Sequence, residues 1–129
     1  MDFLTSNSML MLERSKDFLW TKQAALLDNI ANVETPNYKA KVVTFEESLR
    51  EKLLSAANST KGARQNVRQI LETSEFGVFE PQEAKRMDDN GIDATEQMIE
   101  MVRNSYQQQY VFSALNKSYS ILRMAVRGQ

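Results

Sequence analysis

The sequence predicts a mainly α-helical protein in which long amphipathic helices at the two ends of the chain form a coiled-coil hairpin. Apolar residues recur at alternating spacings of three and four over residues 9–33, and again over residues 98–126. That pattern is typical of helices that bury one face against a partner. The segment between them predicts only a short helix, a flexible loop and minor extended segments. We therefore expect an N-terminal helical part (1–35), a variable middle (36–92) and a C-terminal helix (93–129), with the two ends forming one helical domain.

The N-terminal helix is expected to start among residues 5–8 and to end near residue 33. Its 3-4 spacing places sites at 9, 12, 16, 19, 23, 26, 30 and 33, of which only Lys16 and Gln23 are polar. A second apolar row beside it contains Met11, Phe18 and Ala25. The residues expected to pack in the hairpin are Leu12, Leu19, Leu26, Ile30 and Val33.

The stretch NIANVETPNYKAK, residues 29–41, interrupts this helix. Pro36 disfavours helical backbone at the residue before it, so the helix must end earlier, and Asn32 is suited to a left-handed cap. Pro36 and Asn37 can form the central pair of a turn. Asn29 and Asn32 share a helix face, where their amides can bond the departing loop or another subunit.

The middle of the chain predicts three weaker elements. Residues 38–45 alternate like a short strand, and residues 44–54 predict a helix with Thr44 and Glu47 as a capping box. Residues 55–83 are expected to be a flexible loop, because the stretch up to Gln69 is polar and has no period. Within that loop, Val78 and Phe79 indicate a short extended segment.

The C-terminal helix carries the stronger pattern, with sites at 98, 101, 105, 108, 112, 115, 119, 122 and 126. Asp93 with Glu96 resembles a capping box at its start, and Gly128 follows its last apolar site. A neighbouring apolar row widens the face, so this helix is expected to need neighbours on more than one side. The residues expected to pack in the hairpin or between subunits are Met98, Met101, Phe112, Leu115, Tyr119, Leu122 and Val126.

Composition excludes several classes of function. Sixteen basic and 17 acidic residues leave no field to attract nucleic acid, and the chain has neither cysteine nor histidine. The four glycines are too scattered for a phosphate-binding loop. We expect no catalytic, cofactor-binding or metal site.

The N-terminus predicts no secretory signal and the chain no membrane span. The first residues lack a basic stretch followed by an unbroken apolar run, which a cleaved signal peptide requires. No run approaches the roughly 18 apolar residues of a spanning helix. We therefore expect no direct membrane insertion.

With these features the sequence resembles the axial proteins of the bacterial flagellum, the rod and hook family. That family carries an Ala-Asn pair, a Thr and an aromatic-Lys pair just after its N-terminal helix. The C-terminal segment, ending in ILRMAVRG, is similar to the proximal-rod branch of the family. The resemblance covers roughly residues 1–54 and 84–129. The motif residues here are Asn29, Ala31, Asn32, Thr35, Pro36, Tyr38 and Lys39.

The resemblance implies a structural protein of the flagellar basal body, located in the periplasmic rod. It implies export by the flagellar type III apparatus without a cleaved signal peptide, and self-association through the terminal helices. It further implies that the rod so formed links the membrane ring to the distal rod and transmits torque. The implied partners are the other proximal rod proteins, the rod-ring adaptor protein and the membrane-ring protein.

Other classes of function remain open on the sequence. A helical adaptor or secretion chaperone would use the same hairpin to hold one partner helix in a small complex. A sister rod protein is disfavoured by the ILRMAVRG ending, and a small helical enzyme by the lack of histidine, cysteine and glycine loops.

Overall fold

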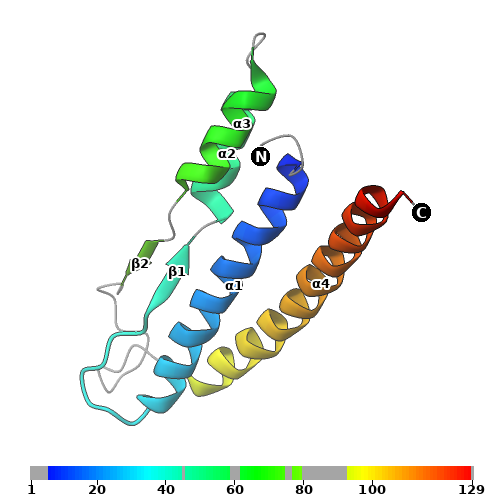
Figure 1. The fold of residues 1–129 in the computed structure, drawn as a ribbon. Coiled ribbons are helices and arrows are strands. Elements are labelled where there is room, and N and C mark those ends of the chain that lie inside the picture. The colour runs from blue at the N-terminus through cyan, green and yellow to red at the C-terminus, as the bar shows by residue number, and fades with distance from the viewer. Residues whose placement is uncertain (1–5, 45, 59–61, 75–76, 80–92, 129) are drawn as a thin grey trace.

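A computed structural model describes residues 6–44, 46–58, 62–74, 77–79 and 93–128. In chain order the elements are α1 (Asn7–Ala31), β1 (Val42–Thr44), α2 (Glu46–Ala57), α3 (Ala63–Thr73), β2 (Gly77–Phe79) and α4 (Ala94–Arg127). Helices α1 and α4 lie side by side in opposite directions, while α2, α3 and the strands lie on the other side of α1 (Figure 1). The mainly helical fold with paired terminal helices is thereby confirmed.

Both ends of α1 are close to their predicted positions. Ser6 is the N-cap, and its hydroxyl accepts a hydrogen bond from the backbone N–H of Met9 at 3.2 Å. The C-cap is Asn32, but its φ of −106° is not left-handed, so that part of the prediction is wrong. The Asn32 side chain instead donates to the carbonyl of Asp28 at 2.8 Å, which satisfies a terminal carbonyl without positive φ.

The predicted caps of α4 are both present. Asp93 accepts hydrogen bonds from the backbone N–H groups of Thr95 at 2.9 Å and Glu96 at 3.3 Å. At the other end Gly128 adopts φ 70°, and its N–H donates to the carbonyl of Met124 at 3.1 Å. The 34 residues of α4 therefore form a rod of about 51 Å.

The middle segment differs from the prediction in two places. Thr44 pairs with Gly77 in the sheet, and α2 begins at Glu46 and continues to Ala57 instead of spanning 44–54. Residues 63–73, expected to belong to a flexible loop, form α3. The stretch up to Gln69 shows no period, but Ile70 and Leu71 complete an apolar helical face with Val67.

Two short strands join the ends of the middle segment. β1 and β2 pair antiparallel, with Val42 opposite Phe79 and Val43 opposite Val78. The extended segment predicted at Val78 and Phe79 is confirmed, whereas the strand predicted over 38–45 is shorter than expected.

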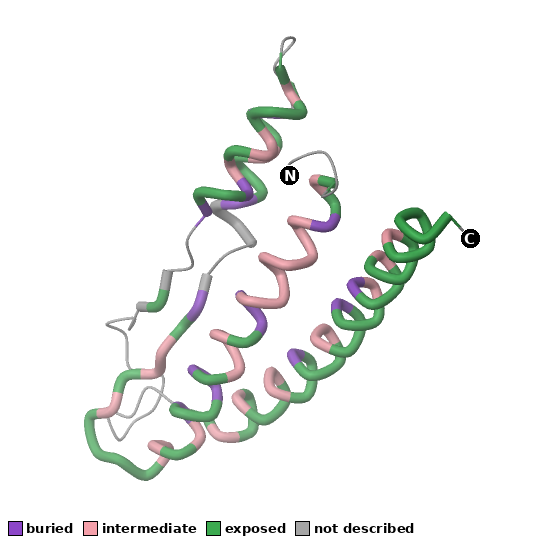
Figure 2. Tube along the Cα trace, in the orientation of Figure 1, coloured by how far each residue is buried: buried purple, intermediate pink, exposed green. Residues whose placement is uncertain are grey.

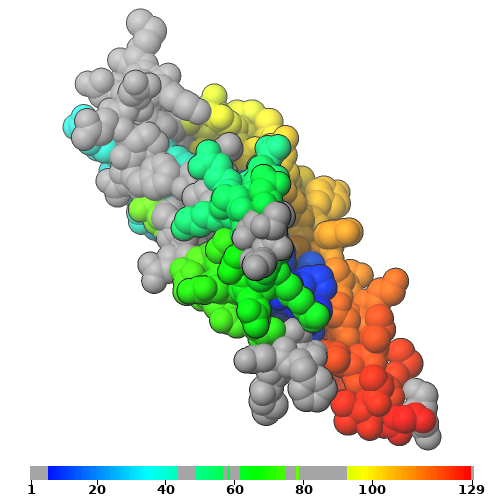
Figure 3. Space-filling model, turned by 90° about the horizontal axis from the view of Figure 1, so that it is seen from above, coloured from blue at the N-terminus to red at the C-terminus, as the bar shows by residue number. Residues whose placement is uncertain are grey.

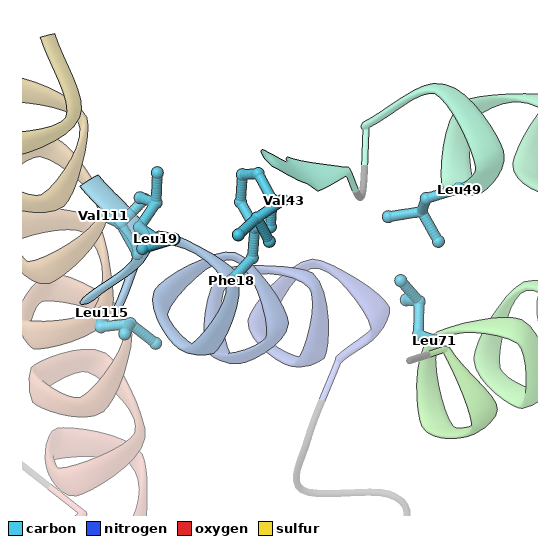
Figure 4. Close-up of a cluster of buried hydrophobic side chains, with 8 residues drawn as sticks. Phe18, Leu19, Val43, Leu49, Leu71, Val111 and Leu115 are labelled. Carbon is cyan, nitrogen blue, oxygen red and sulfur yellow. The ribbon is translucent and has the colours of Figure 1, made fainter. Parts of the chain in front are cut away.

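The core surrounds α1, as Figure 4 shows. Leu19 points toward Val111 and Leu115 of α4 on one side, while Phe18 points toward Val43 of β1 on another. Leu49 of α2 and Leu71 of α3 face each other beyond it, and Leu71 is only 2% exposed. Because neighbouring residues of α1 point to different partners, α1 is the element that joins α4 to the middle segment.

Candidate assembly site on the terminal hairpin

Side-chain amides hold α1 and α4 together at the centre of their contact. Asn104 of α4 is fully buried, and its Nδ2 donates to the carbonyl of Leu19 at 3.0 Å and to Oε1 of Gln23 at 2.8 Å. Gln108 donates to the same carbonyl of Leu19 at 3.1 Å. Gln23, which interrupts the apolar pattern of α1, is therefore the partner of a polar residue of α4, Asn104. Pairing of this kind selects one alignment of two helices.

A second group of polar contacts lies nearer the start of α4. The Nδ2 of Asn29 donates to Oε1 of Gln97 at 2.8 Å, and Asn29 is 1% exposed. Lys22 forms an ion pair with Glu100 at 3.1 Å. These contacts match residues early in α4 with residues late in α1, which confirms an antiparallel hairpin.

The residues of α4 that face α1 differ from the prediction at every second site, where the residue one position earlier in the sequence faces α1 instead. Residues 97, 104, 111 and 118 face α1, together with 101, 108, 115 and 122, which the prediction includes. Figure 2 accordingly shows buried and half-buried positions along one side of α4 and exposed positions elsewhere. Of the predicted packing residues in α4, Leu115 is buried and Met101 and Leu122 are half-buried, while the exposed ones are Met98, Phe112, Tyr119 and Val126.

On α1, the predicted packing residues are covered to different degrees. Leu19 and Leu26 are buried, Leu12 and Ile30 are half-buried, and Val33, just beyond the end of α1, is half-buried as well. Phe18 and Ala25, from the neighbouring apolar row, are also buried. Both apolar rows of α1 are thus used within this chain.

Several exposed apolar residues gather on one side of the hairpin. The hydroxyl of Tyr119 donates to Glu13 at 2.8 Å, so these two positions lie on the same edge. Trp20 and Leu27 follow Glu13 at seven-residue intervals, and Phe112 precedes Tyr119 by seven, which keeps each set on one helix face. We call this surface the Trp20 face; it consists of Trp20, Leu27, Met98, Phe112, Tyr119 and Val126.

The hydrogen bond at the edge of this face also affects titration. It raises the pKa of the Tyr119 hydroxyl, because the neutral phenol donates to the Glu13 carboxylate; desolvation and the nearby negative charge act in the same direction. Neutral Tyr119 is therefore the form that the folded chain favours.

The opposite side of the hairpin carries an apolar groove of about 830 Å³ between α2 and α4. Its walls include Leu53 and Leu54 from α2 and Tyr106 and Tyr110 from α4, and Phe18 of α1 contributes to its floor. Seen from above, atoms of the N-terminal part of α1 are visible between the α2–α3 pair and α4 (Figure 3). The two tyrosines are 69% and 75% exposed, so the wall on α4 is largely open to solvent.

Asn29 bonds the end of α1 to the segment between α1 and β1, residues 32–41, which we call the motif loop. Its Oδ1 accepts from the backbone N–H of Lys41 at 2.8 Å, and its Nδ2 donates to the carbonyl of Lys41 at 2.9 Å. The Lys41 ammonium also pairs with Asp28 at 2.5 Å. Of the two expected partners, the departing loop or another subunit, Asn29 bonds the loop within this chain, and the same amide also bonds Gln97 of α4.

Within the loop, Pro36 and Asn37 form the predicted turn. The N–H of Tyr38 donates to the carbonyl of Thr35 at 3.3 Å, and Asn37 has a φ of 58°. The Thr35 hydroxyl donates to Asn32 at 3.1 Å. The remaining motif residues make no comparable cluster: Ala31 and Lys39 are exposed, and Tyr38 is half-buried with an unpaired hydroxyl.

The apolar pattern of the sequence does not identify the polar residues of the hairpin as partners of one another. Gln23, Gln97, Asn104 and Gln108 all interrupt or border apolar rows. The available signal was that Gln23 lies inside the apolar pattern of the first helix, while the three amides of the last helix recur at spacings of seven and four. Which amide meets which could not be read from one helix alone.

Across the described ranges, no group of three or more acidic, histidine or cysteine side chains is placed to hold a metal ion. None of the helices in those ranges is long and apolar enough to cross a membrane.

Comparison with known proteins gives two relatives and no matching family model. The chain is 26% identical over 126 residues to the flagellar basal body rod protein FlgB of Bacillus subtilis (strain 168), a match covering 97% of each chain. It is 29% identical over 103 residues to the flagellar basal body rod protein FlgB of Borrelia hermsii, covering 73% of this chain and 76% of the relative. The resemblance to the flagellar rod proteins is therefore confirmed, and the chain is FlgB-like along most of its length.

Proposed function

We propose that this chain is a structural component of the bacterial flagellar basal-body rod. It polymerises through α1 and α4 into the proximal rod, which links the membrane ring to the distal rod and transmits torque. The observation that carries this proposal is the Trp20 face, where large apolar side chains of both terminal helices remain in solvent. Trp20 is 67% exposed and Phe112 is 43% exposed, and apolar surface of this kind marks an interaction site.

The similarity to two proteins named as rod proteins supports the same assignment. In the proposed assembly, the chain contacts the other proximal rod proteins, the rod-ring adaptor protein and the membrane-ring protein. Delivery by the flagellar type III apparatus, without a cleaved signal peptide, would place the chain in the periplasmic rod. The role is mechanical, so it requires neither a catalytic site nor a cofactor.

The motif loop fits this role as a joint between the hairpin and the middle segment. Asn29 bonds Lys41 on the loop and Gln97 on α4, so one buried amide ties the loop to both terminal helices. A joint that is tied at both ends transmits force between the inner helices and the outer part of the subunit.

A second candidate is a helical adaptor or secretion chaperone, which the groove between α2 and α4 favours. Its volume of about 830 Å³ suits a few side chains of one partner helix. Such an adaptor would form a small complex of fixed stoichiometry, whereas a rod component would be recovered with detergent-extracted basal bodies.

The test is a charge placed on the Trp20 face. Phe112→Asp adds a carboxylate at a position that the monomer leaves partly exposed, so the variant is expected to keep its helical circular dichroism. It is expected to be missing from purified basal bodies and to abolish swimming in a strain that lacks the wild-type gene. Thr95→Asp is the matched control, because it adds the same charge at the exposed first turn of α4, where an acid is favourable.

Leu115→Asp and Leu122→Asp are also expected to abolish swimming. They are less selective, because Leu115 is 5% exposed within the hairpin and the charge would disturb the monomer as well. Substitutions at Ser59 and Lys61, which lie outside the described residues, are expected to be tolerated. Normal swimming of a well-expressed Phe112→Asp strain would contradict the proposed function.

A further inference from the structure

The hairpin carries two different apolar surfaces on opposite sides. Phe18 belongs to the groove and Trp20 follows it by two residues on α1; Tyr110 belongs to the groove and Phe112 follows it by two residues on α4. Two residues correspond to about 200° around a helix, so both helices turn one apolar surface to each side. The groove and the Trp20 face are therefore back to back.

The two surfaces expose their apolar side chains in different ways. The groove is concave, with leucines of α2 on one wall and tyrosines of α4 on the other. The Trp20 face instead exposes large side chains to solvent, with Trp20 67% and Leu27 51% exposed. Two grooves could not fill each other, but a ridge of large side chains can enter a groove between two helices.

Their charges are complementary. Arg50 lines the groove and has no ion pair with any carboxylate in the part of the chain that the structure describes. Beside the Trp20 face lies Asp17, whose side chain is 46% exposed. Its carboxylate pairs with Lys16 at 3.0 Å, and because the Lys16 side chain is 42% exposed this contact has little strength. The net charge of −1 leaves little repulsion between copies.

We infer that the groove between α2 and α4 receives the Trp20 face of a second copy of this chain. The contact rests on the proposed function and deepens it by naming the two surfaces that meet. Each copy offers one groove and one Trp20 face on opposite sides. Every further copy that joins therefore leaves a free groove at one end of the row and a free Trp20 face at the other. Contacts of this head-to-tail kind extend into open rows unless their rotation closes a ring.

The test uses the absence of cysteine from the chain. Leu54→Cys places a thiol on the α2 wall of the groove at a position that is 55% exposed, and Ser105→Cys places one on the Trp20 face midway between Met98 and Phe112. The two variants carry different epitope tags, are expressed together and are treated with a bis-maleimide in purified basal bodies. Gln65→Cys, exposed on α3, replaces Leu54→Cys in the control.

The expected product is a crosslinked pair carrying both tags, at least ten times more abundant than pairs carrying one tag twice and than the control. A chain with both Leu54→Cys and Ser105→Cys is expected to give a ladder of multimers, whereas each single variant gives none. Crosslinks mainly between identical variants, or to another rod protein, would overturn the inference. The absence of crosslinks between variants that are both recovered in basal bodies would also overturn the inference. That result would leave the proposed function intact. Absence of the wild-type chain from purified basal bodies would contradict both the inference and the proposed function.

Discussion

Helices α1 and α4 have similar sequence patterns but very different environments. In the described chain, α1 buries six of its 25 residues, while α4 buries three of its 34. α1 lies between α4 and the middle segment, so two of its faces are covered. α4 has one covered face, and its remaining apolar residues lie in solvent. An amphipathic pattern thus reports how much surface a helix can bury without saying which molecule covers it.

The largest expected effect separates two phenylalanines. Phe18 of α1 is 5% exposed, so Phe18→Ala is expected to lower the free energy of unfolding by about 3–5 kcal/mol. Phe112 of α4 is 43% exposed, so Phe112→Ala is expected to cost less than about 1 kcal/mol. Urea unfolding of the purified chains, followed by circular dichroism, measures both values.

The two variants, Phe18→Ala and Phe112→Ala, are expected to rank in the opposite order when their recovery with basal bodies is compared. If Phe112→Ala reduces recovery with basal bodies while leaving unfolding unchanged, the division between an internal helix and an assembly helix is supported. Equal losses of stability in the two variants would remove the distinction between α1 and α4.

Asn29→Ala is expected to give the next largest effect, about 2–3 kcal/mol. The substitution leaves the N–H and carbonyl of Lys41 and the amide of Gln97 without their buried partner. Asn32→Ala is the control, because it removes only exposed bonds, to Asp28 and Thr35, and should cost about 1 kcal/mol or less. Amide exchange at Lys41 should accelerate only in Asn29→Ala, and unchanged exchange there would show that Asn29 does not hold the loop.

Asn104→Leu tests why the contact between α1 and α4 is polar. The Oδ1 of Asn104 is buried without a partner, so replacing the amide by an apolar side chain is expected to raise the free energy of unfolding by about 1 kcal/mol. The cost should appear as a second helix alignment, because a polar residue at such a site selects the alignment. Paired spin labels on α1 and α4 would report it as a second distance. A single distance in the variant would mean that the apolar residues alone determine the alignment.

The smallest expected effect concerns pH. The raised pKa of Tyr119 means that its hydrogen bond to Glu13 stabilises the fold fully below the ordinary tyrosine value of 10.0 and is lost as pH rises through the higher folded value. Because the pair is exposed, Tyr119→Phe should cost no more than about 0.5 kcal/mol at neutral pH. The difference between wild type and Tyr119→Phe should vanish in the alkaline range, and a difference that grows there would contradict the assignment.

The local features of this chain were readable from its sequence for physical reasons. Asp93 and Gly128 mark the ends of α4 because capping depends on neighbouring residues alone. Pro36 and Asn37 form their turn for the same reason, since one fixes φ and the other tolerates a positive value. The helix at 63–73 was missed because its apolar face is completed only by Ile70 and Leu71, beyond the polar stretch.

Other features required the tertiary structure. Apolar spacing alone fits either the row through Phe112 or the row through Val111, because both recur at seven-residue intervals. The choice between them follows from the bonds that Asn104 and Gln108 make to Leu19 and Gln23. These bonds join residues 81 to 89 positions apart in the sequence. The sequence by itself therefore determined that the chain forms two long apolar-faced helices with a turn after the first. Only the tertiary structure decided which apolar residues face inward, because that choice is made by partners on the other helix.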